Sequence, residues 1–174
     1  MEDRKKDTKN TRLITVLIML GLLLPSAPAS ADQSSANLSV NVTVNARAKL
    51  TLSTNTINFP DADPDTTPFI PASENAVSVT VKVRTGYSSS ATLTHQAGGN
   101  MASGSNSIPI SSVTWTATGS GFSSGTMSSS TAQTVGSWTG SGTQSGALNF
   151  SLANSWSYTA GTYTVSSTYT LTAP

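Results

Sequence analysis

The sequence predicts an all-β fold built as an antiparallel β-sandwich. Apolar side chains alternate with Ser, Thr and Asn in many short segments, as half-buried strands require. Runs rich in Gly, Ser, Asn and Pro separate these segments, which is typical of an antiparallel sandwich of the immunoglobulin-like type. No window of a dozen residues has a helical period, and no fixed-period repeat indicates a solenoid or a propeller.

The first 31 residues are expected to be a cleaved signal peptide. Residues 1–12 carry a net positive charge, and residues 13–24 form an apolar run that is shorter than the ~20 residues needed to span a bilayer. Ala29 and Ala31 supply the small residues that signal peptidase needs at positions −3 and −1, which predicts cleavage before Asp32. The expected product is a secreted or cell-surface protein without a membrane anchor, with residues 32–174 forming one domain.

Residues 37–46 predict an N-terminal strand with a period of two. Asn, Ser and Thr occupy one face of this segment. The other face is apolar and consists of Leu38, Val40, Val42, Val44 and Ala46. The sequence leaves two possibilities open, because this candidate donor strand can pair within its own domain or with another chain.

The next elements follow from alternation and from turn-forming residues. Residues 50–59 predict a first core strand, and four prolines predict a loop over residues 60–71. Residues 77–83 alternate Val with polar residues and predict a second strand. A short strand is expected at residues 91–93, followed by Gly- and Asn-rich loops within residues 98–106.

The C-terminal half predicts further strands. Residues 108–110 contain a central Pro and predict an edge strand at best, whereas residues 113–117 alternate cleanly. Residues 119–146 are rich in Gly and Ser and have a weaker period, which leaves their order open. Strands are expected again at residues 148–152 and, as a long final strand, at residues 163–171.

The composition argues against most kinds of catalysis and against nucleic-acid binding. Residues 85–174 contain no Asp, Glu, Lys or Arg, and His95 is the chain's single histidine. Such a surface cannot make many phosphate contacts, nor bind an anionic membrane through a polybasic patch. A zinc site or a catalytic triad needs more His, Cys or carboxylate groups than the sequence offers. We therefore expect a protein that is not an enzyme and has no cofactor and no resident metal.

The absence of Cys affects stability. Extracellular domains of this size often contain disulfides, which this chain cannot form. Core packing, a metal or contact with neighbouring subunits must then hold the fold. The sequence Asp61-Ala62-Asp63-Pro64-Asp65 offers alternate carboxylates that suit calcium, but a solvated loop stiffened by Pro is the favoured interpretation.

Two tryptophans are candidate ligand-contact residues. Trp138 and Trp156 lie in Gly- and Ser-rich surroundings, where an exposed indole can stack on a sugar. Trp115 stands in step with apolar neighbours and is expected in the core.

Both ends of the chain resemble known surface proteins. The ending from Ala160 to Pro174 contains Gly161-Thr162-Tyr163 before an alternating strand and resembles the closing strand of pilin subunits of the chaperone-usher and spore-coat-protein-U type. Ile57-Asn58-Phe59 is similar to the Asn-Phe that closes the first strand of such subunits. The segment Val113-Thr114-Trp115 and the ending near Ala173-Pro174 also resemble, more weakly, motifs of WxL-type surface domains.

The pilin resemblance implies that the arm over residues 37–46 leaves its own subunit and completes the sheet of the next one. The first hypothesis is therefore a non-enzymatic structural or adhesion subunit of a surface filament or coat, whose partners are copies of itself or related surface subunits. The second hypothesis is a monomeric domain that binds cell-wall glycan or other carbohydrate. A secreted hydrolase is a third class, which would need His95 close to a carboxylate.

Overall fold

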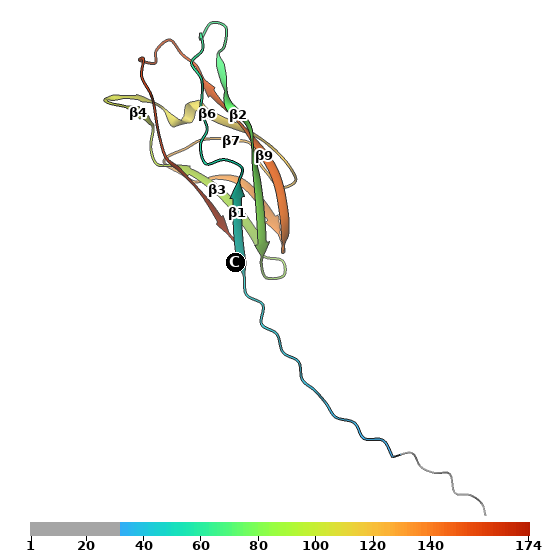
Figure 1. Ribbon diagram of the computed structural model, residues 1–174. Coiled ribbons are helices and arrows are strands. Elements are labelled where there is room, and N and C mark those ends of the chain that lie inside the picture. The colour runs from blue at the N-terminus through green and yellow to red at the C-terminus, as the bar shows by residue number, and fades with distance from the viewer. Residues whose placement is uncertain (1–31) are drawn as a thin grey trace, which may run out of the picture. The chain divides into compact units, whose positions relative to one another are not determined.

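A computed structural model describes residues 32–174 of the chain (Figure 1). The predicted signal peptide, residues 1–31, lies outside the described residues. The chain divides into two units, Met1–Asn41 and Val42–Pro174, and residues 32–41 of the first unit contain no helix or strand. In the part of the chain that the structure describes, no helix is long and apolar enough to cross a membrane.

The second unit is all-β with antiparallel pairing, as the sequence predicts. Its strands are β1 (Arg47–Leu52), β2 (Phe69–Arg84), β3 (Ser90–Ala97), β4 (Met101–Ser103), β5 (Asn106–Ile108), β6 (Val113–Thr118), β7 (Gly125–Thr126), β8 (Gln133–Thr139), β9 (Gly142–Ala153) and β10 (Ser167–Thr172). A single 3₁₀ turn, η1 (Ile110–Ser112), is the helical element among the described residues.

Two main sheets form a sandwich-like arrangement around one core (Figure 1). The larger sheet has the strand order β1-β2-β9-β6-β7, and the smaller sheet has the order β10-β3-β8. The hairpin of β4 and β5 forms a third, two-stranded sheet. Buried side chains from both main sheets belong to the same apolar cluster, so the core lies between them.

The alternation in the sequence explains which faces are buried. In β2 the four valines Val77, Val79, Val81 and Val83 are buried, while most of the residues between them are more exposed. Strand β3 contributes Ala91 and Leu93 to the same core in the same manner. Because the period of a strand is two, a shift of one residue would expose this entire apolar set.

Several sequence-based boundaries are wrong, for identifiable reasons. Strand β2 begins at Phe69 and includes Pro71, because a shift of pairing register between Pro71 and Ala76 accommodates the proline. The final strand begins at Ser167 instead of residue 163, since Thr164 pairs with Ala102 in an isolated bridge. Ile110 lies in the 3₁₀ turn and not in an edge strand.

The region of weak periodicity contains regular structure. Residues 119–146 include β7, β8 and the first part of β9. Glycines interrupt the alternation of apolar and polar residues there, because aromatic rings occupy the space that a side chain would need. A Cβ added to Gly136 or to Gly121 would lie within 2.7 Å of Trp138 atoms. The segment is therefore ordered by packing that the hydrophobic pattern does not reveal.

The predicted strand over residues 37–46 pairs with no other strand within residues 32–174. Its apolar side chains Leu38, Val40, Val42 and Val44 are 88%, 84%, 85% and 62% exposed. An extended segment becomes a strand only when it finds a partner edge, and this segment has none within the described residues. Of the two possibilities that the sequence leaves open, pairing within the same domain is not seen among residues 32–174.

Candidate functional site

Both main sheets end in a strand with a free edge. Strand β1 pairs with β2 alone, and β10 pairs with β3 alone, within the described part of the chain. These two edge strands are in contact with each other, so they form one side of the domain. Free edges present unpaired backbone N–H and C=O groups, which makes this side a template for an added strand.

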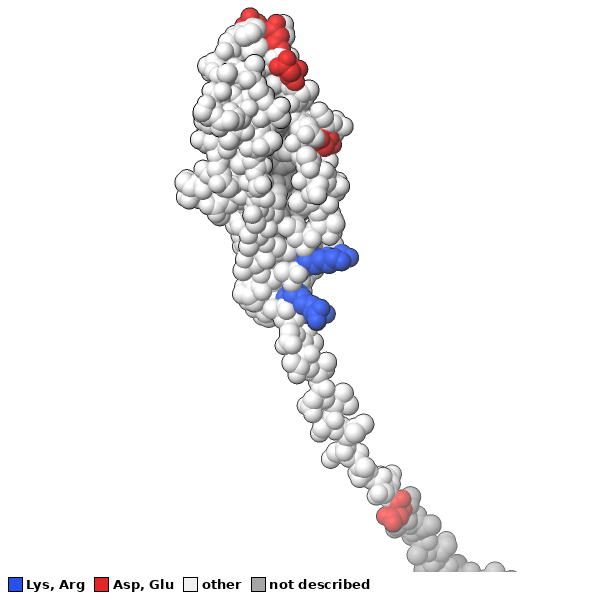
Figure 2. Space-filling view, turned by 60° about the vertical axis from the view of Figure 1, so that its left-hand side comes forward, with Lys and Arg blue, Asp and Glu red and all other residues white. Residues whose placement is uncertain are grey.

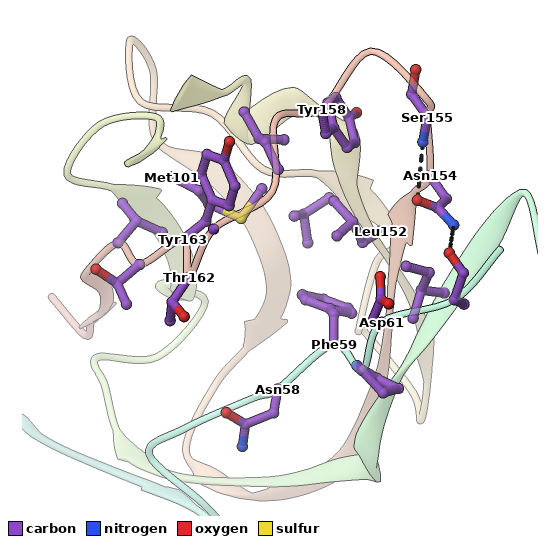
Figure 3. A pocket seen from close by; sticks show the side chains of 18 of the residues that line it. Asn58, Phe59, Asp61, Met101, Leu152, Asn154, Ser155, Tyr158, Thr162 and Tyr163 are labelled. Atoms are coloured by element: carbon purple, nitrogen blue, oxygen red, sulfur yellow. Dashed lines mark hydrogen bonds between the residues drawn. The ribbon is translucent and has the colours of Figure 1, made fainter. Parts of the chain in front are cut away.

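A large pocket lies beside these edges, between residues 56–64 and residues 152–167 (Figure 3). Its volume is about 1000 Å³. Buried core residues form its floor, among them Ile70, Met101, Ile108 and Leu152. One side of the pocket is therefore formed by the core of the domain.

The walls of this pocket are half-buried aromatic side chains. Phe59 comes from the segment after β1, whereas Tyr158 and Tyr163 come from the segment before β10 (Figure 3). Tyr158 donates a hydrogen bond from its hydroxyl to the Ala153 carbonyl at 3.1 Å, and Tyr163 donates to the Thr159 carbonyl at 2.7 Å. These hydrogen bonds fix the rings while leaving their apolar faces on the pocket.

Hydrogen bonds also hold the opposite wall. Asn58 donates its backbone N–H to Glu74 Oε2 at 2.8 Å and its side-chain amide to Glu74 Oε1. The Asn58 carbonyl accepts a hydrogen bond from the Ser73 N–H at 2.8 Å. These hydrogen bonds lower the pKa of Glu74, since they stabilise its charged form. The segment that carries Phe59 is thereby tied to β2.

The loop at the pocket rim is tied to the end of β9. The Asn154 side-chain amide, labelled in Figure 3, donates to the Ala62 carbonyl at 2.9 Å. It also donates to the Thr67 carbonyl at 3.1 Å. The exposed Trp156 donates from Nε1 to Asp65 Oδ1 at 3.0 Å. The Pro-rich loop is therefore a fixed rim of the pocket.

A second pocket, of about 740 Å³, continues the first one along the edge strands. The two pockets share Thr56, Ile57, Met127 and Ser167, so they are parts of one groove. Its apolar lining consists of Leu50, Leu52, Ile57, Val77, Met127 and Phe150, with Tyr169 from β10. We call the two pockets together the edge groove.

The edge groove suits an apolar, extended ligand. Among the described residues that line it, the carboxylates Asp61 and Asp63 stand at one end and no Lys, Arg or His is present. Apolar side chains on the floor and unpaired strand edges at the sides are the two features that bind a β-strand by sheet augmentation. The lining offers little for acid–base chemistry.

The structure places His95 in the core, packed against Tyr169 of the groove lining, and His95 itself does not line the edge groove. Its side chain is 1% exposed, and neither ring nitrogen has a hydrogen-bond partner among the described residues. Its ring centroid lies 4.7 Å from that of Tyr169 and 5.8 Å from that of Trp115. Burial lowers the pKa of His95 and raises the pKa of Tyr169 to about 12.

The two candidate ligand-contact tryptophans differ. Trp156 is 70% exposed. Trp138 is 7% exposed, and its Nε1 donates to the Ser120 carbonyl at 2.8 Å, so the expectation that it is exposed is wrong. Its ring packs edge-on against Phe122 with 4.9 Å between the centroids, which accounts for its burial in a Gly-rich segment.

The acidic loop uses its carboxylates within the chain. Asp63 Oδ1 accepts a hydrogen bond from the Asp65 N–H at 2.9 Å. Over residues 32–174, no group of three or more His, Cys, Asp or Glu side chains is arranged to hold a metal ion. The calcium interpretation of this loop thus gains no geometric support.

Sequence reasoning missed much of the groove. From the sequence, Tyr158 is one of several aromatic residues that could form a sugar-stacking platform, Tyr163 is expected in the core, and Met101 is not singled out. The sequence feature that indicates the groove is that Tyr158 and Tyr163 flank Gly161 in a segment without a clear strand period. Large aromatic side chains in such a segment indicate that they pack on an apolar surface. No protein-family model matches this chain, and no curated protein matches it.

Proposed function

We propose that this protein is a non-enzymatic structural subunit of a surface filament or coat, which assembles by inserting its N-terminal arm into the edge groove of a neighbouring copy. The observation that carries this proposal is the pair of complementary features in one chain. Residues 38–46 present exposed apolar side chains at every second position, and the edge groove presents apolar side chains between two free strand edges.

The dimensions and chemistry of the arm support this role. A fully extended segment of residues 37–46 spans about 33 Å and directs its five apolar side chains to one face. Seated in the edge groove, it would pair its backbone with the free edge of β1 or of β10 and turn the apolar face to the groove floor. Burial of apolar area contributes roughly 25 cal/mol per Å². The arm and the groove both gain from this burial.

The wider proposal places this assembly outside the cytoplasm. The signal-like N-terminus, the immunoglobulin-like sandwich and the resemblance to pilin subunits at both chain ends are consistent with export to a cell surface. A chain without Cys has no disulfide to compensate for an incomplete core. Subunit contact would supply that missing stabilisation.

The exposed indole of Trp156 supports the second candidate function, the binding of cell-wall glycan. Trp156 is 70% exposed on the rim of the edge groove, a position from which a ring can stack on a sugar. This observation favours a monomeric domain that binds cell-wall glycan. The two functions require different residues and can be separated by variants.

The test is an SDS gel of the chain produced from its full coding sequence, loaded with and without boiling. Strand-donated polymers resist SDS and dissociate on heating, so the wild type should give a ladder only when unboiled. A variant lacking residues 37–46 should give a monomer band in both lanes. A monomer band for the wild type in every lane would reject the assembly.

Point variants of the arm provide a matched comparison. Val40→Asp with Val42→Asp places charges on the apolar face, whereas Ser39→Asp with Asn41→Asp adds the same charges to the opposite face. All four positions are exposed, so none of these changes should unfold the domain. The first variant should lose the ladder and the second should keep it. Equal behaviour of the two variants would contradict the proposed seating of the arm.

A further inference from the structure

The charged residues of the domain gather at two opposite ends. From residue 42 onward the Lys and Arg residues are Arg47, Lys49, Lys82 and Arg84, and the Asp and Glu residues are Asp61, Asp63, Asp65 and Glu74. Figure 2 shows acidic side chains at one end of the domain and basic side chains nearer the other end. We call these two sets the basic cluster and the acidic end.

Strand pairing brings the basic cluster together. In the register of β1 and β2, Arg47 lies opposite Arg84, and Lys49 lies opposite Lys82. All four side chains are exposed and share the outer face of the larger sheet. Like charges directly opposite each other on antiparallel strands repel, which weakens this corner of the sheet in the isolated domain. An anionic partner would relieve that repulsion.

The acidic end of the same molecule is too far away to serve as that partner. Glu74 and Arg84 stand in the same strand, ten residues apart, which corresponds to about 30 Å. The Debye length at physiological ionic strength is about 8 Å, so the two ends of one domain barely attract each other. Each charged end is therefore available to another molecule.

The edge groove has one of its ends at the acidic end of the domain. Asp61 and Asp63 line the groove at the pocket of about 1000 Å³. Arg47 follows Ala46, the last apolar residue of the arm, and Lys49 comes two residues later. If the last residue of the inserted arm lies at the end of the groove that Asp61 and Asp63 line, Arg47 of the donating copy comes next to the acidic end of the receiving copy. Charge complementarity and arm insertion then favour the same head-to-tail contact.

We propose that the basic cluster of one copy docks on the acidic end of the next copy, and that this contact fixes the direction and speeds the formation of the assembly. The proposal rests on the proposed self-assembly through the arm and adds a second interface to it. Opposite charges raise the rate of encounter and disfavour the reversed orientation, in which like ends would meet.

Charge reversal with rescue tests the contact. A basic-end variant carries Arg47→Glu and Lys49→Glu, an acidic-end variant carries Asp61→Lys and Asp63→Lys, and a swapped chain carries all four changes. Polymer growth of the full chain is followed by light scattering at low and at high salt. We expect each single-end variant to assemble at least tenfold more slowly at low salt and the swapped chain to recover most of the wild-type rate.

The control variant Thr114→Glu with Thr116→Glu adds two carboxylates to the exposed face of β6, outside both charged ends, and should assemble like the wild type. The proposed charge contact is overturned if the single-end variants assemble at the wild-type rate. It is also overturned if the swapped chain assembles slowly, which is the result expected if the basic cluster binds an anionic wall polymer instead. In either case a heat-sensitive ladder that depends on residues 37–46 would still support the arm insertion. Loss of that ladder dependence would instead reject the proposed function itself.

Discussion

Glu74 accepts hydrogen bonds from both the backbone and the side chain of Asn58, and this contact ties the segment after β1 to the irregular part of β2. The residues on either side of Asn58, Ile57 and Phe59, line the edge groove. A polar contact on the surface thus sets the position of an apolar wall. The contact is exposed, so its role is to restrict local motion and not to add much to the global free energy of unfolding.

Loss of this contact should loosen the groove wall. Glu74→Gln leaves one acceptor oxygen for the two Asn58 donors, so amide hydrogen exchange over residues 53–59 should become faster while the core strands are unchanged. Because the folded-state pKa of Glu74 is lowered, the contact should hold above the ordinary pKa of 4.5 and be lost as the pH falls through the folded pKa. Asp61→Asn is the control, because it removes a nearby carboxylate and leaves both hydrogen bonds between Asn58 and Glu74 in place. Unchanged exchange in Glu74→Gln would contradict this role.

Stability should depend on pH through His95. Burial against Trp115 and Tyr169 lowers its folded-state pKa below the ordinary value of 6.5. The unfolded chain then binds the proton more readily, so full stability is present above about pH 6.5 and decreases as the pH falls towards the folded-state pKa. Urea midpoints measured between pH 5 and 8 should show this decrease.

The variant His95→Leu tests whether His95 causes the change of the urea midpoint with pH. The chain contains a single histidine, so no other side chain has an ordinary pKa in this window. His95→Leu should give a midpoint that is nearly independent of pH between 5 and 8. A slope that persists in the variant would show that the buried imidazole is not responsible.

Substitution of Trp138 and of Trp156 should have different effects on stability, because Trp138 packs in the core and Trp156 is a candidate for ligand binding. Trp138 is buried, so Trp138→Ala should lower the free energy of unfolding by about 3–5 kcal/mol. Trp156 is exposed, so Trp156→Ala should change the free energy of unfolding by only about 0.5 kcal/mol, as is usual for a surface substitution. Denaturant titration measures both, and similar losses would contradict the assigned burial. If folded Trp156→Ala protein failed to bind cell-wall material, the glycan hypothesis would gain support.

Gly121 should tolerate no side chain. Its φ is +78°, and an added Cβ would lie 2.4 Å from Trp138 Nε1 and 2.7 Å from the Ser137 carbonyl oxygen. Gly121→Ala should destabilise the domain by roughly 1–3 kcal/mol from backbone strain, and further from the clash.

Gly140 provides the comparison for that prediction. It has a φ of +80°, but a Cβ there would meet nothing within 4 Å. Gly140→Ala should therefore show the strain alone and be less destabilising in denaturant titration. Equal losses at the two positions would mean that the contact with Trp138 contributes nothing.

Strands in which apolar and polar residues alternate strictly were predictable from the sequence, because this alternation alone determines which side chains are buried. The valines of residues 77–83, the segment 113–117 and the segment 148–152 all lie in strands of the structure. Residues 133–139 were not predictable as a strand, since Gly136 interrupts the pattern to make room for the Trp138 ring. Trp138 itself was misjudged for the same reason, because contacts with Phe122 and Ser120 bury it.

The sequence by itself determined the all-β class, the period-two arm and the absence of Asp, Glu, Lys and Arg from residues 85–174, because each depends only on residue type and spacing. The tertiary structure decided which edges stay unpaired, and it placed the tyrosines of residues 158–163 opposite Phe59 to form the edge groove. It also brought two cations of β1 opposite two cations of β2, which no local pattern indicates. Pairing partners depend on contacts between residues distant in the chain, and a local period carries no information about such contacts.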